Sequence, residues 1–163
     1  MGTDIVQRVA RRFLAEEYAP DPTAPAKGEW DRSGDVPRWR QDHRALVIKA
    51  MHSWKGSPTD MVIAMEDERD GRPVPASGSG KMMRAQAAAL AWEFKHKAKK
   101  APPLFRGSHE QPKGYQPWSS NREVADLWAA KNHGQVFTLE HAKGLRIADY
   151  LGSDPEREWI VLT

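Results

Sequence analysis

The apolar residues of this 163-residue chain change their spacing at Pro102, and that change restricts the folds open to it. Before Pro102 they recur every three or four residues, the spacing that places them along one face of a helix. After Pro102 they form short runs, rich in β-branched and aromatic residues, between turn-forming residues, which is typical of strands. Helices followed by strands predict an α+β fold in which the helices pack on the sheet. We expect one domain over 1–163, mainly helical over 1–100 and strand-rich over 101–163.

The same patterns predict the individual elements. We expect helices over 4–18, from Pro37 to near Gly56, from Ser57-Pro58 to just before Asp70-Gly71, over about 81–99 and over 122–131. We expect strands over 104–106, 135–140 and 156–163, a partly extended segment over 145–150, and loops over 20–28 and 72–80. In the helix over 122–131, the apolar face is formed by Val124, Leu127 and Trp128.

Composition excludes several classes of protein. The chain has no cysteine, which excludes disulfides, thiol catalysis and cysteine–zinc sites. Its six histidines form no His-Glu-x-x-His motif, so we expect no metal. No apolar run approaches the roughly 18 residues that a membrane span needs, and the first residues lack the apolar stretch of a secretion signal. We expect a monomer with no membrane partner, located in the cytoplasm or delivered into a host cell as an effector.

Two segments have both a simple and a functional interpretation. SGSGKM (77–82) is similar to a phosphate-binding loop, but that motif needs Gly in place of Pro75 and Ser or Thr in place of Met82, so we interpret it as a flexible loop. A basic run is most simply a solvated helix end whose charge suits the helix dipole: Lys95, Lys97, Lys99 and Lys100. An acidic or phosphate-bearing partner is the alternative, although a net charge of +3 is too small to imply nucleic-acid binding alone.

Three pieces of the C-terminal segment carry residues suited to chemistry, and the first is LFRG (104–107). Arg106 ends a short apolar run, and Gly107 allows the backbone to approach a ligand closely. The planar guanidinium of arginine donates hydrogen bonds in pairs, which suits a diphosphate. Taken alone, an arginine before a turn is more commonly a surface residue.

The second piece is YQPWSSNREVADLWA (115–129), in which two serines follow an aromatic strand and precede a helix. Ser120 or Asn121 is suited to cap that helix, with Glu123 in its first turn. Capping by either residue leaves the Ser119 hydroxyl available for another contact.

The third piece is DPEREWIVLT (154–163), in which Glu156 and Glu158 flank Arg157 just before a strand. In extended backbone, side chains two residues apart lie on one face, so we expect both carboxylates to point the same way. Adjacent carboxylates repel, and the repulsion is relieved when one takes up a proton or pairs with a cation. Such a pair suits the stabilisation of a developing cation and the removal of a proton. The alternative is a solvated edge strand.

The order Arg, aromatic-Ser, Glu-x-Glu resembles the Arg-Ser-Glu class of mono-ADP-ribosyltransferases, which includes bacterial toxins and phage-encoded enzymes. In that family a Leu-[Phe/Tyr]-Arg-Gly strand is followed by a Ser-Thr-Ser-like strand, a helix of the pattern x-Val-Ala-x-x-[Phe/Trp]-Ala, and a Glu-x-Glu or Gln-x-Glu strand. Here the pieces are LFRG, WSS with EVADLWA, and EREWIVL, and the resemblance covers about residues 100–163. It implies an N-terminal helical layer packed on a C-terminal, mainly antiparallel β-core of the ADP-ribosyltransferase type.

The resemblance implies that NAD is the substrate and assigns residues to it. Arg106 would hold the diphosphate or the adjoining ribose, and Gly107 would offer its backbone to the nicotinamide amide. Glu158 would bind a ribose hydroxyl and stabilise an oxocarbenium-like state as nicotinamide leaves. Ser119 would hold Glu158 in place by a hydrogen bond. The motif here departs from Ser-Thr-Ser, so Ser120 is the rival of Ser119 as the motif serine.

The resemblance also implies an acceptor for the ADP-ribose, in the first place a protein. Glu156 would orient and deprotonate the acceptor nucleophile, and a glutamate at this position favours arginine as the acceptor. The segment 148–155 would recognise the acceptor. Tyr150 in this segment would be either an exposed contact to the acceptor or a buried residue. Trp128 would lie either near nicotinamide or in the helix core.

Other activities remain open on the sequence alone. Water as the acceptor would make the protein an NAD glycohydrolase. Transfer to nucleic acid is another possibility, for which the basic run at 95–100 is the one hint. A degenerate member of the family would bind a partner without turnover, but all three motif pieces are intact here.

Overall fold

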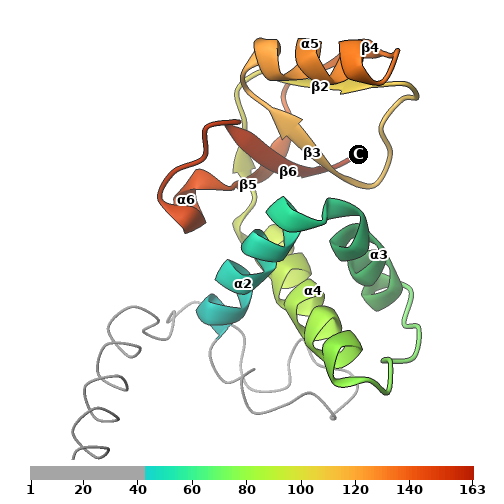
Figure 1. The fold of residues 1–163 in the computed structure, drawn as a ribbon. Helices are drawn as coiled ribbons and strands as arrows, with labels where there is room; N and C mark the ends of the chain where they lie inside the picture. Colours follow the sequence, from blue (N-terminus) through green and yellow to red (C-terminus); the bar gives the residue numbers. More distant parts are fainter. Residues whose placement is uncertain (1–42) are drawn as a thin grey trace, which may run out of the picture.

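The computed structural model describes residues 43–163. The helix expected over 4–18, the loop over 20–28 and the first residues of the helix expected from Pro37 lie outside them. In the described part helices come first and strands follow, so the prediction of an α+β fold is confirmed (Figure 1). The elements in chain order are α2 (His43–Gly56), α3 (Pro58–Arg69), α4 (Gly78–Lys97), β1 (Lys99–Lys100), β2 (Leu104–Ser108), β3 (Tyr115–Ser119), α5 (Arg122–Lys131), β4 (Gln135–Leu139), β5 (Lys143–Arg146), α6 (Ala148–Leu151) and β6 (Glu158–Leu162).

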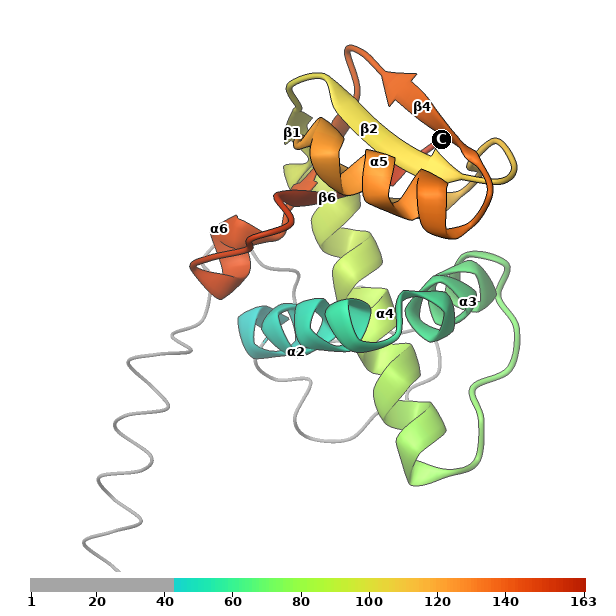
Figure 2. The same cartoon turned by 45° about the horizontal axis from the view of Figure 1, so that its top comes forward.

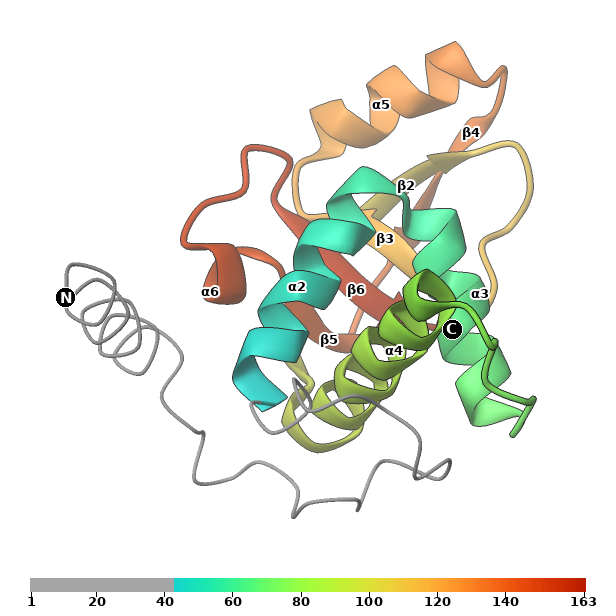
Figure 3. The same cartoon turned by 60° about the horizontal axis from the view of Figure 1, so that its bottom comes forward.

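The helical layer consists of α2, α3 and α4, which pack on one another and cover one side of the sheet (Figure 3). Leu46, Val47 and Ala50 of α2 are buried, and their spacing places them on one face of the helix. α4 contributes several buried residues whose side chains end at Cβ, so the neighbouring helices can approach closely: Ala85, Ala87, Ala88 and Ala89.

Both ends of α4 differ slightly from the prediction. The helix starts at Gly78, inside the expected loop, because the Ser77 side chain caps it by accepting a hydrogen bond from the Gly80 N–H at 3.1 Å. The helix ends at Lys97, and Lys99–Lys100 form the short strand β1 instead of a further helical turn.

The sheet has the strand order β1-β5-β6-β3-β2-β4, and every neighbouring pair is antiparallel. β3 pairs with β6 along its whole length, from Tyr115 opposite Leu162 to Ser119 opposite Glu158. By contrast, β3 pairs with β2 only where Ser119 lies opposite Phe105. The two strands separate beyond this pair, so β2 and β4, with α5 packed against them, lie farther from the helical layer (Figure 1).

Apolar side chains form two clusters, one on each side of the sheet. The larger cluster joins the helical layer to the sheet and includes Trp54 and Ile160. The smaller cluster lies on the other side and includes Trp118 and Trp159. Trp159 and Ile160 are neighbours in β6 and enter different clusters, as the alternation of side chains along a strand requires.

Helix α5 lies across β2 (Figure 2) and buries its small residues instead of its large ones. Ala125 and Ala129 are buried, while Leu127 and Trp128 are exposed, so the apolar face predicted from the larger residues is wrong. The reason is the closeness of the helix to Gly107, where an added Cβ would lie 2.1 Å from the Ala125 carbonyl oxygen. A helix backbone so close to a strand leaves room at the contact for alanine alone.

The last part of the chain differs from the prediction in two places. The segment 145–150 leaves β5 after Arg146 and forms the short helix α6 rather than extended backbone. β6 begins at Glu158, two residues later than the strand expected over 156–163. No helix within residues 43–163 is long and apolar enough to cross a membrane.

Candidate active site

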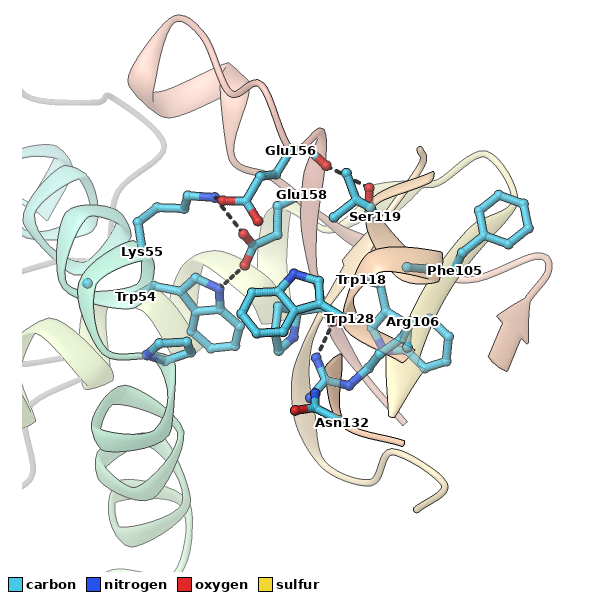
Figure 4. Close-up of a pocket in the computed structure, with 16 residues that line it drawn as sticks. Trp54, Lys55, Phe105, Arg106, Trp118, Ser119, Trp128, Asn132, Glu156 and Glu158 are labelled. Carbon is cyan, nitrogen blue, oxygen red and sulfur yellow. Dashed lines mark hydrogen bonds and ion pairs between the residues drawn. The ribbon is translucent and has the colours of Figure 1, made fainter. Parts of the chain in front are cut away.

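A cavity of about 420 Å³ lies where the end of α2, the diverging strands β2 and β3, α5 and the start of β6 meet (Figure 4). Polar and aromatic side chains from all these elements line it, among them Trp54, Lys55, Arg106, Trp118, Ser119, Trp128, Asn132, Glu156 and Glu158. Gly107 also lines it. Five candidates from the three C-terminal sequence pieces are thus brought together in one place: Arg106, Gly107, Ser119, Glu156 and Glu158.

Glu158 is the first residue of β6 and is 9% exposed. Each of its carboxylate oxygens has one donor: Oε1 accepts from the Trp54 indole N–H at 2.6 Å, and Oε2 accepts from Lys55 Nζ at 2.7 Å. Its backbone N–H donates to Oδ2 of Asp154 at 2.6 Å. A buried carboxylate needs such donors, and both come from the last turn of α2, while Asp154 in the turn before β6 holds the backbone of Glu158.

Glu156 reaches the same ammonium group, and its Oε1 accepts from Lys55 Nζ at 3.0 Å. Its side chain is 48% exposed, so it lies at the mouth of the cavity. Both carboxylates do point the same way, but the expected cause is wrong, since Glu156 precedes the strand and Arg157 has a φ of 48°. A turn, not continuous extended backbone, brings the carboxylates of Glu156 and Glu158 together. The cation that relieves the repulsion between them is Lys55.

Lys55 also lies 3.1 Å from Oδ1 of Asp154, whose side chain is 2% exposed. One ammonium therefore faces three carboxylates. Partial burial lowers the pKa of Lys55, but hydrogen bonds and charge from Glu158, Glu156 and Asp154 outweigh burial and raise that pKa above its ordinary value. Lys55 consequently stays charged at physiological pH.

Ser119 and Ser120 are separated by the structure. The Ser119 hydroxyl is buried, donates to the Glu156 carbonyl oxygen at 2.6 Å and accepts from the Asn121 N–H at 2.9 Å. It therefore supports the turn that carries Glu156, and it does not make the hydrogen bond to the Glu158 carboxylate that we predicted. Ser120 lies outside the cavity lining, with a 3.5 Å contact to the Arg157 carbonyl. Asn121 caps α5, accepting from the Glu123 N–H.

Arg106 lies on the side of the cavity opposite Glu158 (Figure 4). Its Nη1 donates to the Pro117 carbonyl oxygen at 2.7 Å, across the gap where β2 and β3 separate. Burial lowers the pKa of Arg106 from its ordinary value, and the negative charge of Glu158 opposes that shift. Within the described residues, the buried Nε of Arg106 has no hydrogen-bond partner, and neither has the indole N–H of Trp118.

The two remaining candidates have different surroundings. Trp128 lines the cavity and is exposed, with Lys131 Nζ 5.0 Å from its ring centre, so it does not belong to the core. Tyr150 lies away from the cavity, is partly buried against the helical layer, and donates from its hydroxyl to Glu93 Oε1 at 2.9 Å. Its surroundings match the buried alternative. Burial, and the charge of Glu93, raise the pKa of Tyr150.

The residues that hold Glu158 were not found from the sequence. The sequence patterns assign no role to Trp54, Lys55 or Asp154. The contact from Trp54 to Glu158 joins residues 104 positions apart, and no local spacing relates them. A signal existed in Lys55, a cation on the last turn of a helix just before a Gly-Ser-Pro turn, although such a residue is usually a simple helix end.

No protein-family model matches this chain, and no curated protein or solved structure is significantly similar to it. The resemblance to the ADP-ribosyltransferases therefore depends on the motif residues and on their common cavity.

Proposed function

We propose that the protein is an NAD-dependent mono-ADP-ribosyltransferase that transfers ADP-ribose to a protein side chain, with arginine the favoured acceptor. The observation that carries the proposal is the common cavity of Arg106, Ser119, Glu156 and Glu158. These residues come from three different strands or their ends, and the motif order alone would not require them to meet.

The cavity has features suited to NAD. Its volume of about 420 Å³ falls in the range of small-molecule sites, which is roughly 300–1,000 Å³. Arg106 supplies a partly buried cation for the diphosphate or the adjoining ribose. The unpartnered N–H groups of Arg106 and Trp118 would be satisfied by ligand oxygens, since buried donors rarely stay unpaired. The exposed indole of Trp128 offers a flat surface for an aromatic ring such as nicotinamide.

Glu158 is suited to the bond-breaking step. When the bond between ribose C1′ and the nicotinamide nitrogen breaks, its electron pair leaves with nicotinamide and positive charge develops on the ribose. A carboxylate held close to that charge stabilises it, as in glycosidases. The carboxylate has about four lone-pair positions, and Trp54 and Lys55 occupy two of them, so others are left for a ribose hydroxyl.

Glu156 is suited to the second step, in which the acceptor nitrogen forms a bond to C1′ and loses a proton. Its half-exposed carboxylate at the mouth of the cavity is accessible to a large acceptor. A carboxylate pairs well with the guanidinium of arginine and takes up the released proton. Gly107, which we expected to contact nicotinamide, also lines the cavity, but its tight packing against α5 already explains why glycine is needed there.

The test is incubation of the purified protein with NAD labelled in the ADP-ribose part, with and without cell lysate. Nicotinamide release together with label in protein supports the proposal. Label in nucleic acid would show that nucleic acid is the acceptor. Nicotinamide release without any labelled macromolecule would show that the protein is an NAD glycohydrolase. NAD binding without turnover would make the protein a catalytically inactive binding module.

Glu158→Gln provides the matched test of the site, because it keeps the shape of the side chain and removes its charge. We expect NAD cleavage to fall by about 100-fold or more. Glu140→Gln, at an exposed position after β4, is the control and should leave cleavage unchanged. If Glu158→Gln also leaves NAD turnover unchanged, the site is assigned wrongly.

A further inference from the structure

We propose that Trp54 and Lys55 are positioning residues that hold the Glu158 carboxylate for the cleavage of NAD, so that helix α2 completes the active site. This inference depends on the proposed function for its catalytic meaning. It gives the helical layer a part in the chemistry, beyond support of the sheet.

The geometry assigns one donor to each oxygen. Trp54 and Lys55 are adjacent in the last turn of α2, and the indole N–H and the ammonium bind Oε1 and Oε2 of Glu158 at 2.6 and 2.7 Å. With both oxygens held from one helix, the plane of the carboxylate is set relative to the cavity. Figure 4 shows both donors on the side of Glu158 that lies away from Arg106.

Both donors are themselves held in place. Trp54 is fully buried in the cluster between helices and sheet, so the direction of its N–H is set by packing. The Lys55 ammonium is bound on its other sides by Asp154 and Glu156, and its side chain is 24% exposed. A positioning group must be rigid in this way, because an error of about 1 Å in a reacting group can cost on the order of 100-fold in rate.

The charges around Glu158 explain why a cation is needed beside it. Asp154 and Glu156 from the preceding turn share the Lys55 ammonium with Glu158, while Arg106 on β2 is the other cation that lines the cavity. Without Lys55, three carboxylates would lie together with one more distant cation. Their repulsion would drive the side chain of Glu158 away from its position.

The test compares two pairs of variants by steady-state kinetics of nicotinamide release. Trp54→Phe keeps an aromatic ring and removes the N–H, while Trp92→Phe makes the same change at a buried indole N–H that has no hydrogen-bond partner in the described part of the chain. We expect Trp54→Phe to lower kcat by about 10- to 100-fold, the value of a hydrogen bond to a charged group, and to change KM for NAD by less than about twofold. Trp92→Phe should leave both constants near those of the wild type.

The second pair replaces lysines. Lys55→Met should lower kcat by a similar factor, whereas Lys55→Arg keeps the positive charge and should retain most of the wild-type kcat. Lys99→Met breaks the surface pair of Lys99 with Asp149 and should leave kcat nearly unchanged. An unchanged kcat in both Trp54→Phe and Lys55→Met would overturn the inference. A faster transfer in Lys55→Met would also overturn it, since Lys55 would then compete with the cationic acceptor instead of positioning Glu158.

A measurement without NAD separates this inference from the proposed function. In ¹H–¹⁵N spectra, the indole signal that Trp54→Phe removes should move on Glu158→Gln and on Lys55→Met, and stay in place on Lys99→Met. If the position of that signal is unchanged in Glu158→Gln, the positioning contact does not exist, whatever the enzyme activity. If it moves while the wild type fails to cleave NAD, the contact is real and the proposed function is wrong.

Discussion

Arg106 donates a hydrogen bond of 2.7 Å to the carbonyl oxygen of Pro117 and so bridges β2 and β3 where their pairing ends. Proline has no N–H to donate to a neighbouring strand, but its carbonyl oxygen can still accept a hydrogen bond. Here the guanidinium of Arg106 is the donor. Arg106 thereby links the two strands beside the cavity, and its Nε has no hydrogen-bond partner among the described residues and is left for a ligand.

Arg106→Lys should weaken NAD binding by about tenfold or more, because an ammonium cannot both reach Pro117 and donate in pairs to a diphosphate. Titration calorimetry with NAD measures the change in Kd. Arg122→Lys, at an exposed position on α5, is the control. Equal Kd values for Arg106→Lys and the wild type would show that the diphosphate binds elsewhere.

Glu156→Gln should abolish transfer to protein and leave residual hydrolysis of NAD. The amide cannot take up the proton of the acceptor, whereas Glu158 keeps its donors Trp54 and Lys55 for bond breaking. The ratio of labelled protein to released nicotinamide checks this. An equal loss of both activities would contradict the acceptor role of Glu156.

Ser119→Ala should destabilise the protein by about 1–3 kcal/mol, since the Glu156 carbonyl and the Asn121 N–H lose the buried hydroxyl that both contact. Transfer should fall more than hydrolysis, because the turn that carries Glu156 loosens. Ser120→Ala removes one contact of 3.5 Å and should change stability by less than about 0.5 kcal/mol. Urea unfolding of both variants measures the difference, and the reverse order would make Ser120 the structural serine.

Gly107→Ala should cost more than about 2 kcal/mol, because its Cβ would lie 2.1 Å from the Ala125 carbonyl oxygen and 2.3 Å from the Ala129 N–H nitrogen. Both are backbone atoms, so α5 has to move off β2. Gly78→Ala is the control, with no atom within 4 Å of an added Cβ. Thermal unfolding gives the comparison, and similar Tm values for the two variants would refute the close packing.

Glu93→Gln should destabilise the protein at pH 7 by about 1–3 kcal/mol, and by less in acid. Burial raises the pKa of Glu93, but hydrogen bonds from His43 and Tyr150 outweigh it and lower the pKa below its ordinary value. A lowered pKa in the folded state gives stability that is complete above the unfolded value, about 4.3, and is lost as pH falls through the folded value. Urea unfolding at pH 7 and pH 3 measures this, and a difference that grows in acid would contradict it.

The sequence predicted what local spacing determines. The helices ending near Gly56 and Arg69, the helix Arg122–Lys131 and the strand starting at Leu104 agree with expectation, because periodicity, proline and caps act within a few residues. The burial of Ala125 instead of Leu127 was missed, since it follows from a contact with Gly107 that hydrophobicity does not encode.

The candidate site divides in the same way. Arg106, Ser119, Glu156 and Glu158 were found because each belongs to a recognisable local pattern. Trp54 and Asp154 belong to none, and the local position of Lys55 is that of an ordinary helix end. The roles of all three arise from tertiary contacts, the longest across 104 residues. The positive φ of Arg157, which turns Glu156 and Glu158 toward one lysine, also had no local signal.

The position of β6 between β3 and β5 has a consequence for the order of assembly. A chain still being synthesised can form the helices and several strand pairs early, but the middle of the sheet stays empty until residues 158–162 emerge. Contacts between such distant parts of a chain slow folding. The carboxylate that begins β6 is therefore placed after the strands on either side of it, and a chain that stops before residue 158 would lack the proposed activity.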